Sequence, residues 1–158
     1  CLEMKIETMP NGQLTQRLNG ETVTHDAIEL FANKKVALFA VPGAFTPTCS
    51  TSHLPGFVAL ADKIKAKGVD QIVCLSVNDA FVMEAWGQAH NAEEIMMLGD
   101  GDGSYTKALG LDKETGAFGG IRSQRYSMII DNGVVTNLNV EQPKEFKISD
   151  AETLLGQL

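Results

Sequence analysis

A short apolar segment that leads directly into a proline-containing helix start constrains the fold of this chain most. Residues 36–41 form a continuous run of Val, Ala, Leu and Phe, a pattern typical of a central strand with both faces covered. Apolar residues then recur at helical spacing from 54 to 64. Between the two, Pro47 suits the first position of a helix, so we expect Thr46 to be its N-cap. Cys49 then falls in the first turn.

A cysteine at this position is expected to ionise readily. A thiolate in the first turn of a helix faces unpaired backbone N–H groups and the positive end of the helix dipole. Full ionisation of an ordinary thiol at neutral pH raises its reactivity only about 30-fold, or about 2 kcal/mol. Any faster reaction needs further groups that hold the substrate and meet the charge that develops on it. The sequence therefore predicts Cys49 as a nucleophile with helper residues.

Other candidate sites have simpler interpretations. Cys74 lies inside the apolar stretch 72–75 and is interpreted as a buried hydrophobic residue. His53 follows Cys49 by four residues on the same helix face, so a Cys-His metal pair is conceivable. No further Cys or His stands at ligand spacing, so we interpret His53 as an ordinary helical histidine and predict no metal site. Residues 100–104 resemble the start of a calcium loop, but Tyr105 and Leu111 occupy the positions that require Gly and Glu.

Composition narrows the class of protein. The chain has 158 residues, 44% of them hydrophobic, and a net charge of −7. We therefore expect one globular domain over residues 4–158, with residues 1–3 an artificial or processing remnant. Dispersed basic residues argue against a nucleic-acid or anionic-membrane surface, and no apolar run suggests a membrane span or a signal peptide. Three cysteines without a C-x-x-C pair favour a reducing compartment, so we expect a cytoplasmic protein.

The order of predicted elements is that of an α/β domain. A hairpin is expected around Asn19-Gly20 and another around Asn132-Gly133, the favoured two-residue turns. The predicted strands lie at residues 36–41, 71–77, 126–131 and 134–140. The predicted helices lie at residues 25–32, from Thr46 to about Lys67, at 80–89, at 105–109 and after Asp150. Loops are expected at 99–103 and 116–120. Parallel strands joined by helices and followed by an antiparallel hairpin predict a mixed sheet.

With these residues in view, the chain resembles the peroxiredoxins, in particular the type-5 (atypical) subgroup. Pro42, Thr46 and Cys49 spell the motif P-x-x-x-T-x-x-C. The similarity continues in the segments 75–82, 100–104 and 125–128, and it covers the chain clearly from about residue 34 onward. Together, in this order, these segments form a specific signature.

This resemblance implies a thioredoxin-like fold, in which helices flank a mixed central β-sheet. It implies an antioxidant thiol peroxidase that reduces hydrogen peroxide and alkyl hydroperoxides without a cofactor. Cys49 would be the peroxidatic nucleophile and become a sulfenic acid, with Thr46, Arg125 and Pro42 as catalytic helpers. Arg125 would contact the sulfur and the peroxide, and Pro42 would shield the thiolate from water. From the residues alone Arg125 is not preferred over Arg122, and only the resemblance selects it.

The chain departs from the subgroup in one respect. Members that resolve their own sulfenic acid carry a second cysteine in the C-terminal stretch, whereas residues 141–158 contain none. We therefore expect a one-cysteine cycle, with glutathione or glutaredoxin as the external reductant by resemblance. The subgroup also implies a homodimer, with residues 116–120 and Ala80-Phe81 as candidate contacts. Two alternatives remain open, a peroxide sensor that relays oxidation to a partner protein and a catalytically silent interaction module.

Overall fold

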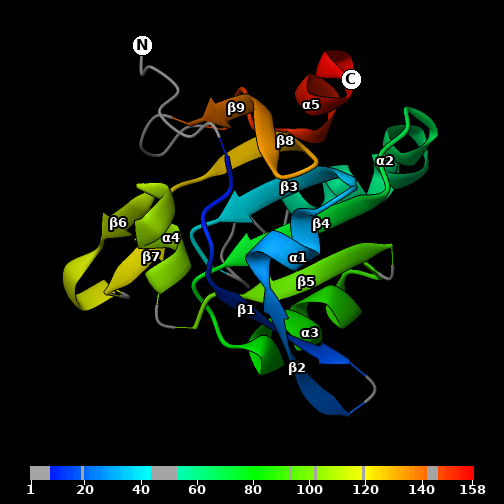
Figure 1. Cartoon of the computed structure of the whole chain (residues 1–158). Helices are drawn as coiled ribbons and strands as arrows, with labels where there is room; N and C mark the ends of the chain where they lie inside the picture. The colour runs from blue at the N-terminus through cyan, green and yellow to red at the C-terminus, as the bar shows by residue number, and fades with distance from the viewer. Residues whose placement is uncertain are drawn as a thin grey trace.

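The computed structural model describes residues 8–18, 20–43, 53–92, 94–101, 103–118, 120–141 and 146–158 (Figure 1). Its strands are β1 (Gln13–Leu18), β2 (Glu21–Asp26), β3 (Lys35–Val41), β4 (Gln71–Ser76), β5 (Ile95–Gly99), β6 (Asp112–Glu114), β7 (Ile121–Ser123), β8 (Tyr126–Asp131) and β9 (Val134–Val140). Its helices are α1 (Ala27–Phe31), α2 (Leu54–Ala66), α3 (Ala80–Ala89), α4 (Ser104–Leu109) and α5 (Ala151–Gln157), with a 3₁₀ turn, η2 (Gly116–Phe118).

Seven strands form one mixed sheet in the order β2-β1-β5-β4-β3-β8-β9. Strands β3, β4 and β5 are parallel, whereas β8 pairs with β3 in the antiparallel direction and β9 continues the hairpin. Strands β6 and β7 form a separate two-stranded ribbon, which projects with α4 at the left of Figure 1. The predicted mixed sheet flanked by helices, a thioredoxin-like fold, is confirmed.

Strand β3 lies between two hydrophobic clusters because its side chains alternate between the faces of the sheet. Ala37, Phe39 and Val41 join the cluster built with α2, α3 and α5. Val36, Leu38 and Ala40 join the cluster built with α1 and α4. All six are buried, as the continuous apolar run predicted.

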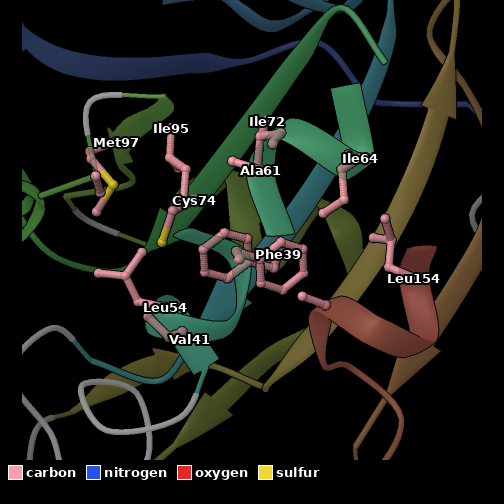
Figure 2. Packing of buried hydrophobic residues seen from close by; sticks show 14 of the residues in the cluster. Phe39, Val41, Leu54, Ala61, Ile64, Ile72, Cys74, Ile95, Met97 and Leu154 are labelled. Carbon is pink, nitrogen blue, oxygen red and sulfur yellow. The ribbon is translucent and has the colours of Figure 1, made fainter. Parts of the chain in front are cut away.

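The packing of the first cluster anchors α2 on the sheet. The rings of Phe39 and Phe57 stack with their centroids 4.0 Å apart and their planes 6° apart. Figure 2 labels Phe39 in this cluster together with Leu154, which α5 contributes. Residues of α2 and α5 also contact one another. The helix that follows the Cys49 segment is therefore held by the sheet and by the C-terminal helix together.

The N-terminal and C-terminal hairpins form as predicted, with Gly20 and Gly133 at φ 82° and 78° in their turns. The Asp150 side chain caps α5 by accepting from the Thr153 N–H. The prediction was incomplete elsewhere: β5, β6 and β7 were not expected. The helix predicted at 25–32 is only α1, because His25 and Asp26 pair with β1.

The predicted helix start at Thr46 lies outside the described residues, so its capping stays a prediction. His53, immediately before α2, already has helical backbone angles of φ −70° and ψ −60°. Among the helices of the described ranges, none combines the length and apolarity needed to cross a bilayer.

Candidate active site

The candidate site lies where β3 ends, at the carboxyl edge of the parallel strands. Val41 pairs with Ser76 of β4, and the Ser76 hydroxyl lies 3.1 Å from the Val41 carbonyl oxygen. Pro42 follows in a bend and is half buried. Pro42 therefore stands, as predicted, at the point where the chain leaves the sheet toward the Cys49 segment.

Arg125 reaches the same edge from the other neighbour of β3. Ala40 pairs with Tyr126 in the antiparallel register, so the preceding Arg125 emerges beside Val41 and Pro42. Its Nη1 atom donates to Nδ1 of His53 over 3.0 Å. Its guanidinium carbon also lies 5.7 Å from the centre of the Phe146 ring, within the range of a cation–π contact. The structure thus brings Arg125 and Pro42 to one edge.

His53 is not the ordinary helical histidine that the sequence suggested. It is fully buried, and its ring packs against the rings of Phe39, Phe57 and Phe146 at centroid distances of 5.0, 5.6 and 5.0 Å. Its Nε2 atom lies 2.9 Å from the carbonyl oxygen of Ser149, which can only accept. Nε2 therefore carries the proton, and Nδ1 is free to accept from Arg125.

The surroundings of His53 keep its ring neutral. Burial, followed by the nearby positive charge of Arg125, lowers the pKa of His53 from 6.5 to about 3, although the hydrogen bond to Ser149 opposes this shift. A neutral acceptor orients the Arg125 guanidinium without cancelling its charge. The hydrogen bond to His53 therefore leaves Arg125 a cation, the form that can act on a thiolate or on a peroxide oxygen.

The two other predicted site residues, Thr46 and Cys49, lie outside the described residues. Their roles stay predictions. In the sequence, His53 follows Cys49 by four residues. Arg125, through His53, is therefore tied to the same short stretch of chain that carries the cysteine.

The structure distinguishes the other candidate residues, Cys74 and Arg122, from Arg125. Cys74 is fully buried, and Figure 2 shows its sulfur among the apolar side chains of the α2 cluster, as predicted. Arg122 has a different partner: its Nη1 makes a long 3.4 Å contact with the Val77 carbonyl oxygen. Arg125, which the resemblance selected, is the one bonded to His53. Within the described ranges, no group of three or more His, Cys, Asp or Glu side chains is placed to bind a metal ion.

Sequence reasoning missed two further residues of this region, Ser149 and Glu141. Ser149 lies 96 positions after His53, yet its carbonyl oxygen holds the histidine ring. Glu141, directly after β9, is buried with 6% exposure and accepts hydrogen bonds from the turn that contains Ser149. A glutamate directly after the predicted strand 134–140 was the available signal, but one sequence alone does not show that it is buried or what it contacts.

Comparisons with known proteins identify the family. A model of the Redoxin family matches residues 5–155. Reduced Prx3 of Vibrio vulnificus, solved in complex with H2O2, is 63% identical over 99% of both chains, with a TM-score of 0.96. Peroxiredoxin-2C of Oryza sativa subsp. japonica is 47% identical over 96% of each chain. The 1-Cys peroxiredoxin of Plasmodium falciparum is 29% identical over 96% of each chain, with a TM-score of 0.86. The chain therefore belongs to the Redoxin family and, within it, to the peroxiredoxins, which are thiol-dependent peroxidases.

Proposed function

We propose that this chain is a one-cysteine peroxidase of the type-5 subgroup in which the Cys49 thiolate reduces hydrogen peroxide and small alkyl hydroperoxides. The observation that carries the proposal is the guanidinium of Arg125, held by neutral His53, four residues after Cys49. A fixed cation near Cys49 would favour both the thiolate and the leaving oxygen. The bound H2O2 in Vibrio vulnificus Prx3 supports this substrate.

In the proposed reaction, the Cys49 sulfur attacks one peroxide oxygen and the O–O bond breaks. A new S–O bond forms, and the other oxygen leaves as hydroxide or alkoxide, which then takes up a proton. Cys49 becomes a sulfenic acid and the peroxide is reduced to water or an alcohol. Thr46 would bind the peroxide through its hydroxyl, Arg125 would stabilise the negative charge as it moves to oxygen, and Pro42 would shield the thiolate from water.

Recycling would need a thiol from outside the chain. The sequence contains only Cys1 and Cys74 besides Cys49, and Cys74 is buried in the core strand β4. A disulfide requires the two Cα atoms to approach within about 7 Å, which a residue fixed in a central strand cannot adjust for without local unfolding. Glutathione would instead condense with the sulfenic acid and release water. A second glutathione, or glutaredoxin, would then cleave the mixed disulfide and restore the Cys49 thiolate.

The finer expectations on assembly and compartment belong to the same proposal. A reducing compartment such as the cytoplasm suits a free thiolate and a glutathione cycle. For a homodimer, Phe81 at the start of α3 offers an apolar contact, since its ring is 60% exposed. It is steadied from its own chain, because the Arg17 guanidinium lies 4.5 Å from the ring centre.

Mass spectrometry after less than one equivalent of hydrogen peroxide tests the chemistry. We expect one added oxygen on Cys49 in the wild type and in Cys74→Ser, and none on the protein in Cys49→Ser. When glutathione is then added without glutaredoxin, a species heavier by one glutathione should accumulate on Cys49. Cys74→Ser is the matched control, because it removes a thiol from the core and leaves the cysteine segment unchanged.

Peroxidase turnover of the same variants, measured with glutathione, glutaredoxin or thioredoxin, can overturn separate parts of the proposal together with the mass spectra. Equal losses of peroxidase turnover in Cys49→Ser and Cys74→Ser would make Cys74 a participating thiol and end the one-cysteine cycle. Full turnover with thioredoxin alone, and no trapped adduct, would reject glutathione while leaving the peroxidase intact. Fast oxidation with negligible turnover by any of these reductants would favour the peroxide sensor.

A further inference from the structure

We propose that Glu141 is a positioning residue for Arg125. Glu141 acts through Ser149 and His53 and sets the orientation of the Arg125 guanidinium. This inference rests on the proposed function, because it matters for catalysis only if Arg125 assists the reaction. It assigns a role in the site to the C-terminal segment, although the segment contributes no cysteine.

The hydrogen bonds of these four residues form a closed ring. The backbone N–H of Glu141 donates to the Arg125 carbonyl oxygen over 2.9 Å. Oε2 of Glu141 accepts from the N–H and the hydroxyl of Ser149 over 2.8 and 2.7 Å. The Ser149 carbonyl oxygen accepts from His53 Nε2, and His53 Nδ1 accepts from Arg125 Nη1. The same ring of hydrogen bonds therefore holds both the backbone and the side chain of Arg125.

The carboxylate is the member that fixes the turn. The same oxygen also accepts from the N–H groups of Lys147 and Ile148, over 2.7 and 2.8 Å. Four donors on one carboxylate oxygen require a full negative charge, since charge-assisted bonds are about twice as strong as neutral ones. They fix the peptide of Ser149, whose carbonyl in turn decides where the His53 proton points. A neutral amide at position 141 is a weaker acceptor, so the turn would loosen.

Loosening the turn should reach Arg125 without touching it. If the Ser149 carbonyl moves, the Nε2–H tautomer of His53 loses its partner, and Nδ1 is no longer reserved as the acceptor for Arg125. Misplacing a catalytic group by about 1 Å can cost up to about 100-fold in rate. The expected cost of a loosened turn is smaller, because Arg125 keeps its backbone bond to Glu141.

A double-mutant cycle on the rate of Cys49 oxidation by hydrogen peroxide, followed by stopped-flow Trp86 fluorescence, tests this link. We expect Glu141→Gln to slow oxidation about tenfold in the wild type and by less than about twofold in the Arg125→Met background. Asp100→Asn, which alters another buried carboxylate with no bond to His53 or Arg125, should keep the wild-type rate. Equal slowing by Glu141→Gln in both backgrounds, or none in the wild type, would overturn the inference.

A second variant and a second measurement keep the test decisive if Glu141→Gln does not fold. Ser149→Ala removes one of the four donors and keeps the backbone bonds, so it should slow oxidation less, again only when Arg125 is present. Independently of any peroxide, the ¹⁵N shifts of the His53 ring should report a pure Nε2–H tautomer in the wild type and a mixture in Glu141→Gln or Ser149→Ala. An unchanged tautomer in both variants would refute the link.

The two measurements also separate this inference from the proposed function. One outcome is a mixed His53 tautomer in Glu141→Gln or Ser149→Ala, combined with a wild-type rate of Cys49 oxidation in Arg125→Met. It would leave the link from Glu141 to His53 intact and refute the catalytic role of Arg125. A pure Nε2–H tautomer in Glu141→Gln and Ser149→Ala, combined with slowed oxidation in Arg125→Met, would refute the link and support the catalytic role of Arg125.

Discussion

Two buried carboxylates in this molecule do the same local task and have different consequences. Glu141 follows β9 and Asp100 follows β5, and both are almost inaccessible. Glu141 holds the segment that leads into α5, and Asp100 holds the first turn of α4. The Asp100 carboxylate accepts from the Thr106 N–H and hydroxyl, both over 2.7 Å, and from the Tyr105 N–H. Glu141 accepts from three N–H groups and the Ser149 hydroxyl.

The difference lies in what the held segment touches next. The carbonyl oxygen of Thr106 accepts from the Leu111 N–H, which only closes the turn after α4. The carbonyl oxygen of Ser149 accepts from His53, and His53 holds Arg125. Asp100 therefore holds residues that contact the turn after α4 and, through the Tyr105 hydroxyl, the Pro10 carbonyl oxygen, whereas Glu141 leads to the candidate active site. A hydrogen-bond motif by itself does not reveal a functional role; its connections do.

The largest expected effect comes from removing the guanidinium of Arg125, which the hydrogen bonds of Glu141, Ser149 and His53 hold. Arg125→Met should lower the rate of Cys49 oxidation by about 100-fold or more, the usual cost of losing a transition-state donor. A lost thiolate fraction alone explains at most about 30-fold. Measuring the Cys49 pKa and the oxidation rate in the same variant separates the two contributions. A rate that merely follows the thiolate fraction would leave Arg125 no role in the transition state.

The next prediction concerns how the free energy of unfolding depends on pH through His53, a member of the same hydrogen-bond ring. The unfolded chain binds a proton at His53 near pH 6.5, whereas the folded chain resists it down to about pH 3. The His53 contribution to stability is therefore complete above pH 6.5 and is lost, by about 1.4 kcal/mol per pH unit, as the pH falls toward 3. We expect a His53→Gln variant to show a flatter fall in the free energy of unfolding between pH 6.5 and 4.5, measured in urea. Parallel curves for both proteins would contradict a buried neutral His53.

Glu141 should act in a lower pH range. Burial raises the pKa of its carboxyl, but the hydrogen bonds from Ser149, Ile148 and Lys147 outweigh burial and hold the pKa below its ordinary value of 4.5. Its contribution is present above pH 4.5 and is lost only below that. The two ranges allow His53 and Glu141 to be distinguished in one titration.

The smallest expected difference is in stability itself. Glu141→Gln and Asp100→Asn should each destabilise the fold by about 1 to 3 kcal/mol, because each leaves buried donors poorly paired. Urea unfolding at pH 7 measures both, and similar values would show that the two carboxylates are equivalent as structural elements. If Asp100→Asn also slowed peroxide oxidation, the contrast between the two sites would be lost.

Much of this architecture could be predicted from local sequence patterns. The apolar run of β3, the Asn132-Gly133 turn and the Asp150 cap each depend on neighbouring residues, and each is confirmed. Strand β5 was missed because its apolar run of Ile, Met, Met and Leu is short. Strands β6 and β7 have three residues each, too few for any periodicity to show.

The candidate site was predictable only in part, and for a different reason. Pro42 and Arg125 were selected by their resemblance to a family motif, and the structure brings both to the end of β3. His53 bonds to Arg125, 72 positions away, and to Ser149, 96 positions away. Glu141 bonds to Ser149, eight positions away. Such pairings follow from the three-dimensional packing of α2, β8 and the segment before α5, which no local pattern encodes.

The closed ring of hydrogen bonds also has a consequence for the protein during its synthesis. Cys49 and His53 leave the ribosome long before Arg125, and Arg125 leaves before Glu141 and Ser149. Until residue 149 has emerged, His53 has no carbonyl to fix its proton and therefore cannot hold the arginine in place. If Cys49 and Arg125 act as proposed, a nascent or truncated chain would carry the thiol without the oriented cation, and we expect full reactivity toward peroxide only once the chain is complete enough to fold.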